Sequence, residues 1–257
     1  LVNDVVAGLK QGGRLIYCGA GTSGRLGVLD ASECPPTFCS DPGQVVGFIA
    51  GGDGALRVAV EGAEDDWQGA HAEIDRLELG QHDTLVGIAA GGTTPYVWGA
   101  IQYAGQRGAT TALLTCVTIK SLQTRPRAEV VKGNQPLSVP PPPALPAPVD
   151  HPVELLVGPE VITGSTRLKA GTATKQALNM ISTASMLQLG KAWGNLMVDL
   201  KASNAKLVDR SIRILTTQTG LSREDAADAI DQAEGSVKVA LVMVQRKLTR
   251  DAALALL

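Results

Sequence analysis

Aromatic side chains are scarce in this 257-residue chain, where Phe, Tyr and Trp together make up 3% of the residues. So few rings leave little material for stacking on nucleic-acid bases. Lys and Arg (23) nearly balance Asp and Glu (25), and a net charge of −2 provides no basic excess to attract nucleic acid or an anionic membrane. We therefore expect neither nucleic acid nor a membrane among the partners.

Cysteine is also scarce, and the four cysteines form no Cys-x-x-Cys pair: Cys18, Cys34, Cys39 and Cys116. Reduced thiols in the cytoplasm are the plain interpretation. No histidine lies near Cys34 or Cys39 in the sequence, so we expect no metal site. The sequence contains neither an apolar run of membrane-spanning length nor a signal-peptide pattern. It begins with Leu1 instead of Met, and we expect it to be a piece of a longer protein.

Glycine, in contrast, is abundant (29 residues), and 44% of the chain is hydrophobic. This composition and length suit one sizeable α/β domain with a small appendage. Apolar runs typical of buried strands are found at 14–18, 45–50, 84–89, 111–116 and 152–157. Helical patterns alternate with them, and the runs themselves do not alternate in polarity. This arrangement predicts a three-layer α/β fold, with a parallel sheet covered by helices on both faces.

The expected helices and domains follow from the same periodicity. We predict helices at 1–11, from 26 until Pro35-Pro36 ends the pattern, and then at 56–63, 65–77, 95–107, 168–191 and 204–219, followed by three short helices after Ser222. Residues 117–150 hold more than half of the 14 prolines and predict a proline-rich surface loop, with a proline-motif docking site as the less favoured interpretation. We place one domain at 1–207 and a helical domain at 208–257.

A glycine-rich loop follows the first predicted strand. Gly19, Gly21 and Gly24 permit a sharp turn that leaves backbone N–H groups uncovered, and Thr22 and Ser23 add hydroxyl donors just before a helix. Such a loop is suited to bind a phosphate. It lacks the lysine of a nucleoside-triphosphate loop, and its match to the dinucleotide fingerprint lacks the later acidic residue. We predict that Thr22, Ser23 and Gly24 hold a phosphate.

Carboxylates follow the predicted strand ends on the same side of the sheet. Glu33 comes ten residues after Ser23, and Glu61 and Glu64 follow the second strand. From the residues alone, Glu33 is equally an ordinary carboxylate near a helix end, and spacing does not choose between Glu61 and Glu64. A second Gly/Thr loop, at 90–95, opens another helix at the ligand-binding edge of the sheet.

Four motifs stand out: Gly21-Thr-Ser-Gly-Arg25, Asp30-Ala-Ser-Glu-Cys-Pro-Pro36, Val60-Glu-Gly-Ala-Glu-Asp65 and Gly164-Ser-Thr-Arg-Leu-Lys-Ala-Gly-Thr-Ala173. They closely resemble motifs of the N-acetylmuramic acid 6-phosphate etherase family, which belongs to the sugar isomerase (SIS) fold group, and the resemblance spans nearly the whole chain. It implies a flavodoxin-like SIS domain with a small ubiquitin-associated-like helical domain. It also implies a cytoplasmic homodimer with active sites near the subunit interface, acting in peptidoglycan recycling.

The resemblance further implies a lyase reaction that needs no cofactor. The D-lactyl ether of N-acetylmuramic acid 6-phosphate would be cleaved by elimination and water addition, giving N-acetylglucosamine 6-phosphate and D-lactate. Glu64 would remove the proton at C2, while Glu33 would assist departure of lactate and later activate water. The expected substrate contacts are Thr22, Ser23, Gly24, Thr94 and Ser165, although Ser165 and Thr166 are equally suited to cap the following helix.

Two alternatives and three departures accompany this hypothesis. An aldose–ketose sugar-phosphate isomerase would also use a carboxylate base, and a non-catalytic sugar-phosphate-binding regulator would need none. Glucokinase regulatory protein is such a regulator, but it duplicates the core, and this chain shows one copy. In the second loop, the family typically reads Ala-Ser-Gly-Arg-Thr-Pro where this chain has Ala90-Gly-Gly-Thr-Thr-Pro95. The proline-rich segment is longer than the family connection, and the family's N-terminal helical arm does not precede Leu1.

Overall fold

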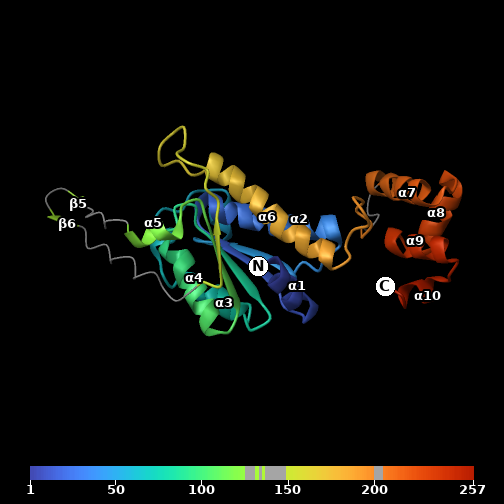
Figure 1. The fold of residues 1–257 in the computed structure, drawn as a ribbon, viewed down its shortest axis with the longest axis horizontal. Coiled ribbons are helices and arrows are strands. Elements are labelled where there is room, and N and C mark those ends of the chain that lie inside the picture. Colours follow the sequence, from blue (N-terminus) through green and yellow to red (C-terminus); the bar gives the residue numbers. More distant parts are fainter. Residues whose placement is uncertain (125–130, 133–134, 137–148, 200–204) are drawn as a thin grey trace. The chain divides into compact units, whose positions relative to one another are not determined.

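The computed structural model describes residues 1–124, 131–132, 135–136, 149–199 and 205–257 (Figure 1). The chain divides into two compact units. The first unit comprises residues 1–32 and 43–183, and the second comprises residues 33–42 and 184–257. We describe each unit by itself.

A five-stranded parallel sheet forms the centre of the first unit. Its strands are β1 (Leu15–Gly19), β2 (Val45–Ile49), β3 (Thr84–Ile88), β4 (Thr110–Thr115) and β7 (His151–Glu154), in the order β2-β1-β3-β4-β7. Every neighbouring pair runs parallel. All residues of β1 and β3 are buried, which explains why their sequences are continuously apolar instead of alternating. The predicted parallel sheet is confirmed.

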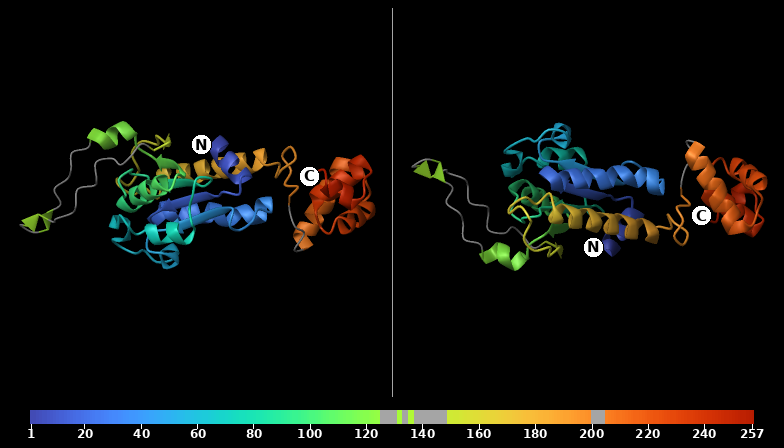
Figure 2. Two further views of the ribbon diagram at one scale, coloured as in Figure 1. Left: turned by 90° about the horizontal axis from the view of Figure 1, so that it is seen from below. Right: turned by 90° about the horizontal axis from the view of Figure 1, so that it is seen from above.

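Helices pack on both faces of this sheet (Figure 2). They are α1 (Val2–Lys10), α2 (Gly21–Phe38), α3 (His71–Arg76), α4 (Pro95–Gln106), α5 (Ile119–Thr124) and α6 (Lys169–Gln188). Ile16 and Cys18 of β1 share a core cluster with Trp98 of α4. Tyr17, which lies between them, points the other way and meets α2 at Gly27. Successive side chains of one strand thus build both layers, and the predicted three-layer α/β architecture is confirmed.

Some predicted helices are wrong in position or extent. Pro35 and Pro36 do not end α2, which continues to Phe38. Each proline removes one N–H from the helical ladder, but both lie in the final turns, where few bonds remain to be lost. The start of α2 was also placed late, because the helix begins at Gly21 and incorporates the glycine loop in its first turn.

The segment after β2 also differs from the prediction. Instead of a helix at 56–63, it forms two short 3₁₀ turns, η1 (Asp53–Leu56) and η2 (Ala63–Asp65). Gly51, Gly52 and Gly62 adopt positive φ angles, which interrupt any longer helix. The helix expected at 65–77 is reduced to α3.

Most of the predicted proline-rich loop, 117–150, lies outside the described residues. The described parts include α5 and a small antiparallel pair, β5 (Val131–Lys132) and β6 (Gln135–Pro136).

The second unit contains the predicted C-terminal helices, which are α7 (Ala205–Thr219), α8 (Arg223–Gln232), α9 (Val237–Arg246) and α10 (Arg250–Leu254). Hydroxyl caps start three of them. Ser222 accepts a hydrogen bond from Asp225 N at 3.0 Å, and Ser236 and Thr249 cap α9 and α10 in the same way. Fully buried Leu215 and Val237 belong to an apolar core between these helices. The predicted small helical domain is confirmed.

Candidate functional site

The start of α2 has the geometry of an anion-binding helix terminus. Gly24 N donates to Ala20 O at 3.2 Å, which opens the helix directly behind β1. A side chain on Gly24 would place its Cβ 2.6 Å from Gly19 O, so the strand and the helix can meet this closely only with glycine here. The first N–H groups of a helix lack intrahelical acceptors and point outward. Thr22 and Ser23, both half-buried, lie in this first turn as the predicted phosphate site requires.

A cavity of 190 Å³ opens beside this helix terminus, at the carboxyl ends of β1 and β2. Gly21 and Arg25 of α2 line it on one side, and Glu61 and Glu64 line it from the segment after β2. Both glutamates are exposed. The structure therefore brings the predicted base, Glu64, to the same cavity as the start of the predicted phosphate site. Glu61 shares that cavity, so the choice between the two carboxylates still rests on the family resemblance.

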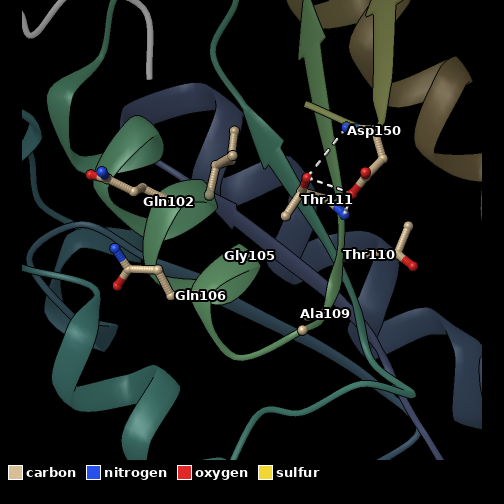
Figure 3. A pocket seen from close by; sticks show the side chains of 9 residues that line it. Gln102, Gly105, Gln106, Ala109, Thr110, Thr111 and Asp150 are labelled. Atoms are coloured by element: carbon tan, nitrogen blue, oxygen red, sulfur yellow. Dashed lines mark hydrogen bonds between the residues drawn. The ribbon is translucent and has the colours of Figure 1, made fainter. Parts of the chain in front are cut away.

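A larger cavity, of 540 Å³, lies at the opposite edge of the sheet, where β4 begins (Figure 3). Its carboxylate, Asp150, already accepts hydrogen bonds from Thr111 N and Thr111 Oγ1, each at 2.8 Å. In doubly wound sheets, ligands bind outside the carboxyl ends of the strands. We therefore assign the candidate site to the smaller cavity.

Glu33 lies exposed on α2 beyond the glycine turn. Ten residues of helix separate it from Ser23, which amounts to about 15 Å along the axis. As far as the described residues go, Glu33, Thr94 and Ser165 do not line the 190 Å³ cavity. The structure thus joins Glu64 to the start of α2 but does not bring Glu33 into the same cavity.

The second glycine loop also ends in a helix terminus at the carboxyl edge of the sheet. Thr94 is the N-cap residue of α4, and Pro95 occupies the first turn as expected. Gly92 has φ +71°, and its carbonyl accepts a hydrogen bond from Trp98 Nε1 at 2.9 Å. The loop is therefore rigidly connected to its own helix, and the role of Thr94 in binding stays a prediction.

The start of α6 is capped by a residue that the sequence did not indicate. Glu160 accepts hydrogen bonds from Lys169 N and Ala170 N, each at 2.9 Å, and neither Ser165 nor Thr166 takes that place. The N–H of Ala170, followed by that of Lys169, holds the pKa of Glu160 below its usual value against partial desolvation. The α6 terminus also approaches the phosphate site, because a Cβ on Gly171 would lie 3.4 Å from Thr22 Cγ2. Ser165 is thereby free to serve as the predicted substrate contact.

Helices α2 and α6 are joined by a buried polar contact. Asp30 Oδ1 accepts hydrogen bonds from Asn179 Nδ2 at 2.6 Å and from Ser182 Oγ at 3.2 Å. Asp30 is 5% exposed. Because buried polar groups are costly unless hydrogen-bonded, this contact fixes the register of the two helices against each other.

Among the described residues, no group of three His, Cys, Asp or Glu side chains is arranged to hold a metal ion. None of the described helices is long and apolar enough to cross a membrane.

Two protein-family models match separate parts of the chain. Residues 1–105 match the N-terminal SIS domain of glucokinase regulatory protein, and residues 194–255 match its C-terminal lid domain. With the parallel sheet and the helix-terminus site, these matches define a protein of the SIS class with a helical lid domain. Among solved structures, the phosphoheptose isomerase of Neisseria gonorrhoeae aligns with 14% identity over 74% of this chain and 83% of its own, at a TM-score of 0.44 that is too low to carry an argument.

Curated relatives identify the family within that class. The N-acetylmuramic acid 6-phosphate etherase of Parasynechococcus marenigrum (strain WH8102) is 50% identical over 256 residues, which cover 100% of this chain and 74% of the relative. Etherase 1 of Bacillus licheniformis is 49% identical, covering 99% of this chain and 75% of its own. The etherase of Gloeobacter violaceus is 52% identical over 94% of this chain and 72% of its own. The chain belongs to the N-acetylmuramic acid 6-phosphate etherase family.

Proposed function

We propose that this protein is an N-acetylmuramic acid 6-phosphate etherase, a carbon–oxygen lyase that releases D-lactate and N-acetylglucosamine 6-phosphate. The observation that carries the proposal is the cavity in which Glu64 faces the start of α2, in a chain about half identical to etherases along nearly its whole length. The helix terminus suits a phosphate, and the carboxylate suits proton abstraction from the sugar attached to it.

The chemistry that we propose consists of proton transfers on the ring-opened sugar. Its C1 aldehyde makes the proton on C2 acidic, and Glu64 takes that proton as the base. The C3–O bond then breaks, and the departing lactate oxygen receives a proton from Glu33. Water, activated by Glu33, adds to the resulting alkene at C3, and C2 regains a proton. The two carboxyl groups must begin in opposite protonation states, which different environments can impose.

Binding of the substrate, in this proposal, relies on groups at three chain segments. The phosphate would be held by Gly24 and the hydroxyls of Thr22 and Ser23 at the start of α2, with Thr94 and Ser165 contributing from the other two segments. Removal of a hydrogen bond to a charged group costs about 1.5–3 kcal/mol, so these contacts would determine affinity.

We further propose a cytoplasmic homodimer that acts in peptidoglycan recycling. All four cysteines carry free thiols, which suits a reducing compartment. Large apolar side chains are exposed in the loop before α6 and on α6 itself, namely Val161 (89%), Ile162 (60%) and Met180 (63%), which suits burial against a second copy. We propose residues 1–207 as the sugar-phosphate domain and residues 208–257 as the helical domain.

A deuterium experiment tests the proposed function and the assignment of the base. In D₂O, the parent protein should release D-lactate and place deuterium at C2 of the sugar product. Glu64→Gln should lose both activities, by about 10²–10⁴-fold. Glu33→Gln should lose lactate release but can retain exchange at C2 of added product. Glu61→Gln is the matched control from the same cavity and should retain both activities.

The outcomes separate the candidate functions. Interconversion of an aldose and a ketose without lactate would indicate an isomerase, and binding without turnover would indicate a regulator. Full exchange in a folded Glu64→Gln protein, with loss in Glu61→Gln, would transfer the role of base to Glu61.

A further inference from the structure

Arg25 connects the start of α2 to the segment that carries Glu64. It lies one turn beyond Gly21, and its guanidinium reaches the backbone of η1. Nε donates to Leu56 O at 3.0 Å, and Nη2 donates to Ala55 O at 2.6 Å. The Arg25 side chain is half-buried and lines the same 190 Å³ cavity as Glu64. One side chain therefore spans from the helix of the predicted phosphate site to the loop of the predicted base.

The segment at 52–66 has few other ties to the sheet. The backbone hydrogen bonds that its N–H groups make in the described structure join residues three or four apart, such as Ala55 N to Gly52 O and Asp65 N to Gly62 O. Bonds this local shape the two 3₁₀ turns but do not position them against the rest of the unit. Position must come from packing and from long-range contacts such as those of Arg25, which connect residues about 30 positions apart in the chain.

The far end of the segment has a separate anchor. Ala63 and Trp67 pack on the core cluster that includes α4. The carbonyl of Trp67 lies so close to Gly99 that a Cβ on that glycine would be 1.8 Å from it. Glu64 is thus held between a packed anchor on its C-terminal side and the guanidinium contact on its N-terminal side.

The chemistry of the contact suits a structural tie more than an ion pair. Both acceptors of Arg25 are neutral carbonyls, so these bonds do not use the charge of Glu61 or Glu64. Arginine offers a planar fork of donors that can hold two acceptors at once, whereas lysine offers a compact point charge on a flexible stem. Two successive carbonyls at the end of a 3₁₀ turn match the fork.

We propose that Arg25 is a positioning residue for Glu64. By holding Ala55 and Leu56 to α2, it fixes the segment so that the Glu64 carboxylate faces the cavity at the start of the helix. The catalytic part of this proposal rests on the proposed function. The anchoring part concerns the segment alone and can be measured without substrate.

Limited trypsin digestion tests the anchoring. Arg57 is exposed in the segment, and Lys247 is exposed at the end of α9 in the second unit. In Arg25→Met and Arg25→Lys, cleavage after Arg57 should accelerate about tenfold or more, because opening of the segment costs less free energy. Cleavage after Lys247, measured in the same digest by mass spectrometry, should stay at the parental rate and shows that the variants remain folded.

Kinetics test the positioning role. The kcat for D-lactate release should fall about 10²-fold in Arg25→Met, as displacement of a catalytic group by about 1 Å can cause. Binding of the product, N-acetylglucosamine 6-phosphate, measured by calorimetry, should change little. Arg25→Lys should remain close to Arg25→Met, because one ammonium cannot replace the fork. Arg57→Met and Arg57→Lys are the matched controls and should retain parental kcat.

Three results discriminate between the explanations. Parental cleavage after Arg57 in both Arg25 variants would overturn the anchoring role. Loss of product binding in proportion to kcat/KM, with unchanged cleavage, would overturn the positioning role and make Arg25 a ligand contact. Faster cleavage in variants of a parent that releases no D-lactate would support the anchoring while refuting the proposed function.

Discussion

Asp83, at the start of β3, accepts more hydrogen bonds than any simple surface carboxylate would. Its oxygens receive Arg14 N at 2.8 Å, Arg14 Nε at 3.0 Å, Arg14 Nη2 at 2.8 Å and Gly80 N at 2.9 Å. The Asp83 side chain is 6% exposed and that of Arg14 is 25% exposed. Burial opposes ionisation of Asp83, but the bonds from Arg14 and Gly80 outweigh it, so the pKa of Asp83 lies below its usual value.

We predict that Asp83→Asn destabilises the protein in a pH-dependent way. Removing one partner of a buried pair costs about 3 kcal/mol at the low end of the known range, which suits the partly exposed Arg14. Because the folded-state pKa is lowered, this stability is present above the unfolded pKa of about 3.9 and is lost as the pH falls through the folded value. Urea unfolding at a series of pH values should show the difference at pH 7 and its decline below about pH 4.

Asp228→Asn is the control for this measurement, since Asp228 is exposed on α8. It should alter the free energy of unfolding by less than about 0.5 kcal/mol. An Asp83→Asn deficit that stays constant down to pH 2.5 would show that ionisation of Asp83 does not contribute.

Single residues differ in how far the sequence predicts their role. Gly24 is recognisable because only a glycine loop before a helix can approach a strand this closely, and that constraint is local. Arg25 and Glu160 were missed as structural contacts because their acceptors and donors lie about 30 and 10 positions away in the chain. Their side chains look like ordinary surface charges until the tertiary fold places a carbonyl or a helix terminus beside them.

At the scale of elements, the contact between α4 and the loop before α3 depends on a missing side chain. Gly99 allows the Trp67 carbonyl to lie against the helix. We predict that Gly99→Ala destabilises the protein by about 1–3 kcal/mol, because the helix and the loop must separate. It should also lower the rate of lactate release, since Trp67 follows Glu64 by three residues.

Gly105→Ala, on the same helix, is the matched control. Its Cβ would lie 3.7 Å from Thr111 Cγ2, which is an ordinary contact. Alanine is favoured over glycine in a helix by about 0.5–1 kcal/mol, so this variant should be slightly stabilised. Chemical denaturation that ranked the two variants equally would refute the close approach at Gly99.

Elements were predictable where periodicity determines them and unpredictable where glycine and proline compete with it. The five apolar strands and α4 lie within a residue or two of their predicted positions. The helix expected at 56–63 did not form, because Gly51, Gly52 and Gly62 take positive φ angles and the intervening residues settle into 3₁₀ turns. Pro35 and Pro36 were given too much weight, since a proline near a helix end removes few bonds.

For the molecule as a whole, the alternation of strands and helices was enough to predict the parallel three-layer fold. Buried strands joined by helical crossovers admit few other arrangements. The lid-domain match at 194–255 likewise agrees with the helical periodicity near the C-terminus. The placement of both carboxylates in one site was beyond the sequence, because it depends on how far along its helix each side chain lies.

The length of α2 has a consequence for how two copies would cooperate. Glu33 lies about 15 Å along the axis from Ser23, which is farther than a hexose phosphate spans from phosphorus to C3. In a symmetric dimer, Glu33 of one copy can serve the cavity of the other, so that neither copy owns a complete set of carboxylates. Mixing inactive Glu33→Gln and Glu64→Gln chains, after dissociation and reassembly, should then restore about a quarter of the parental lactate release, because half of the dimers are mixed and each has one intact site. Rescue at that level would mark the active site as a property of the pair, and a mixture as inactive as its components would return both carboxylates to one chain.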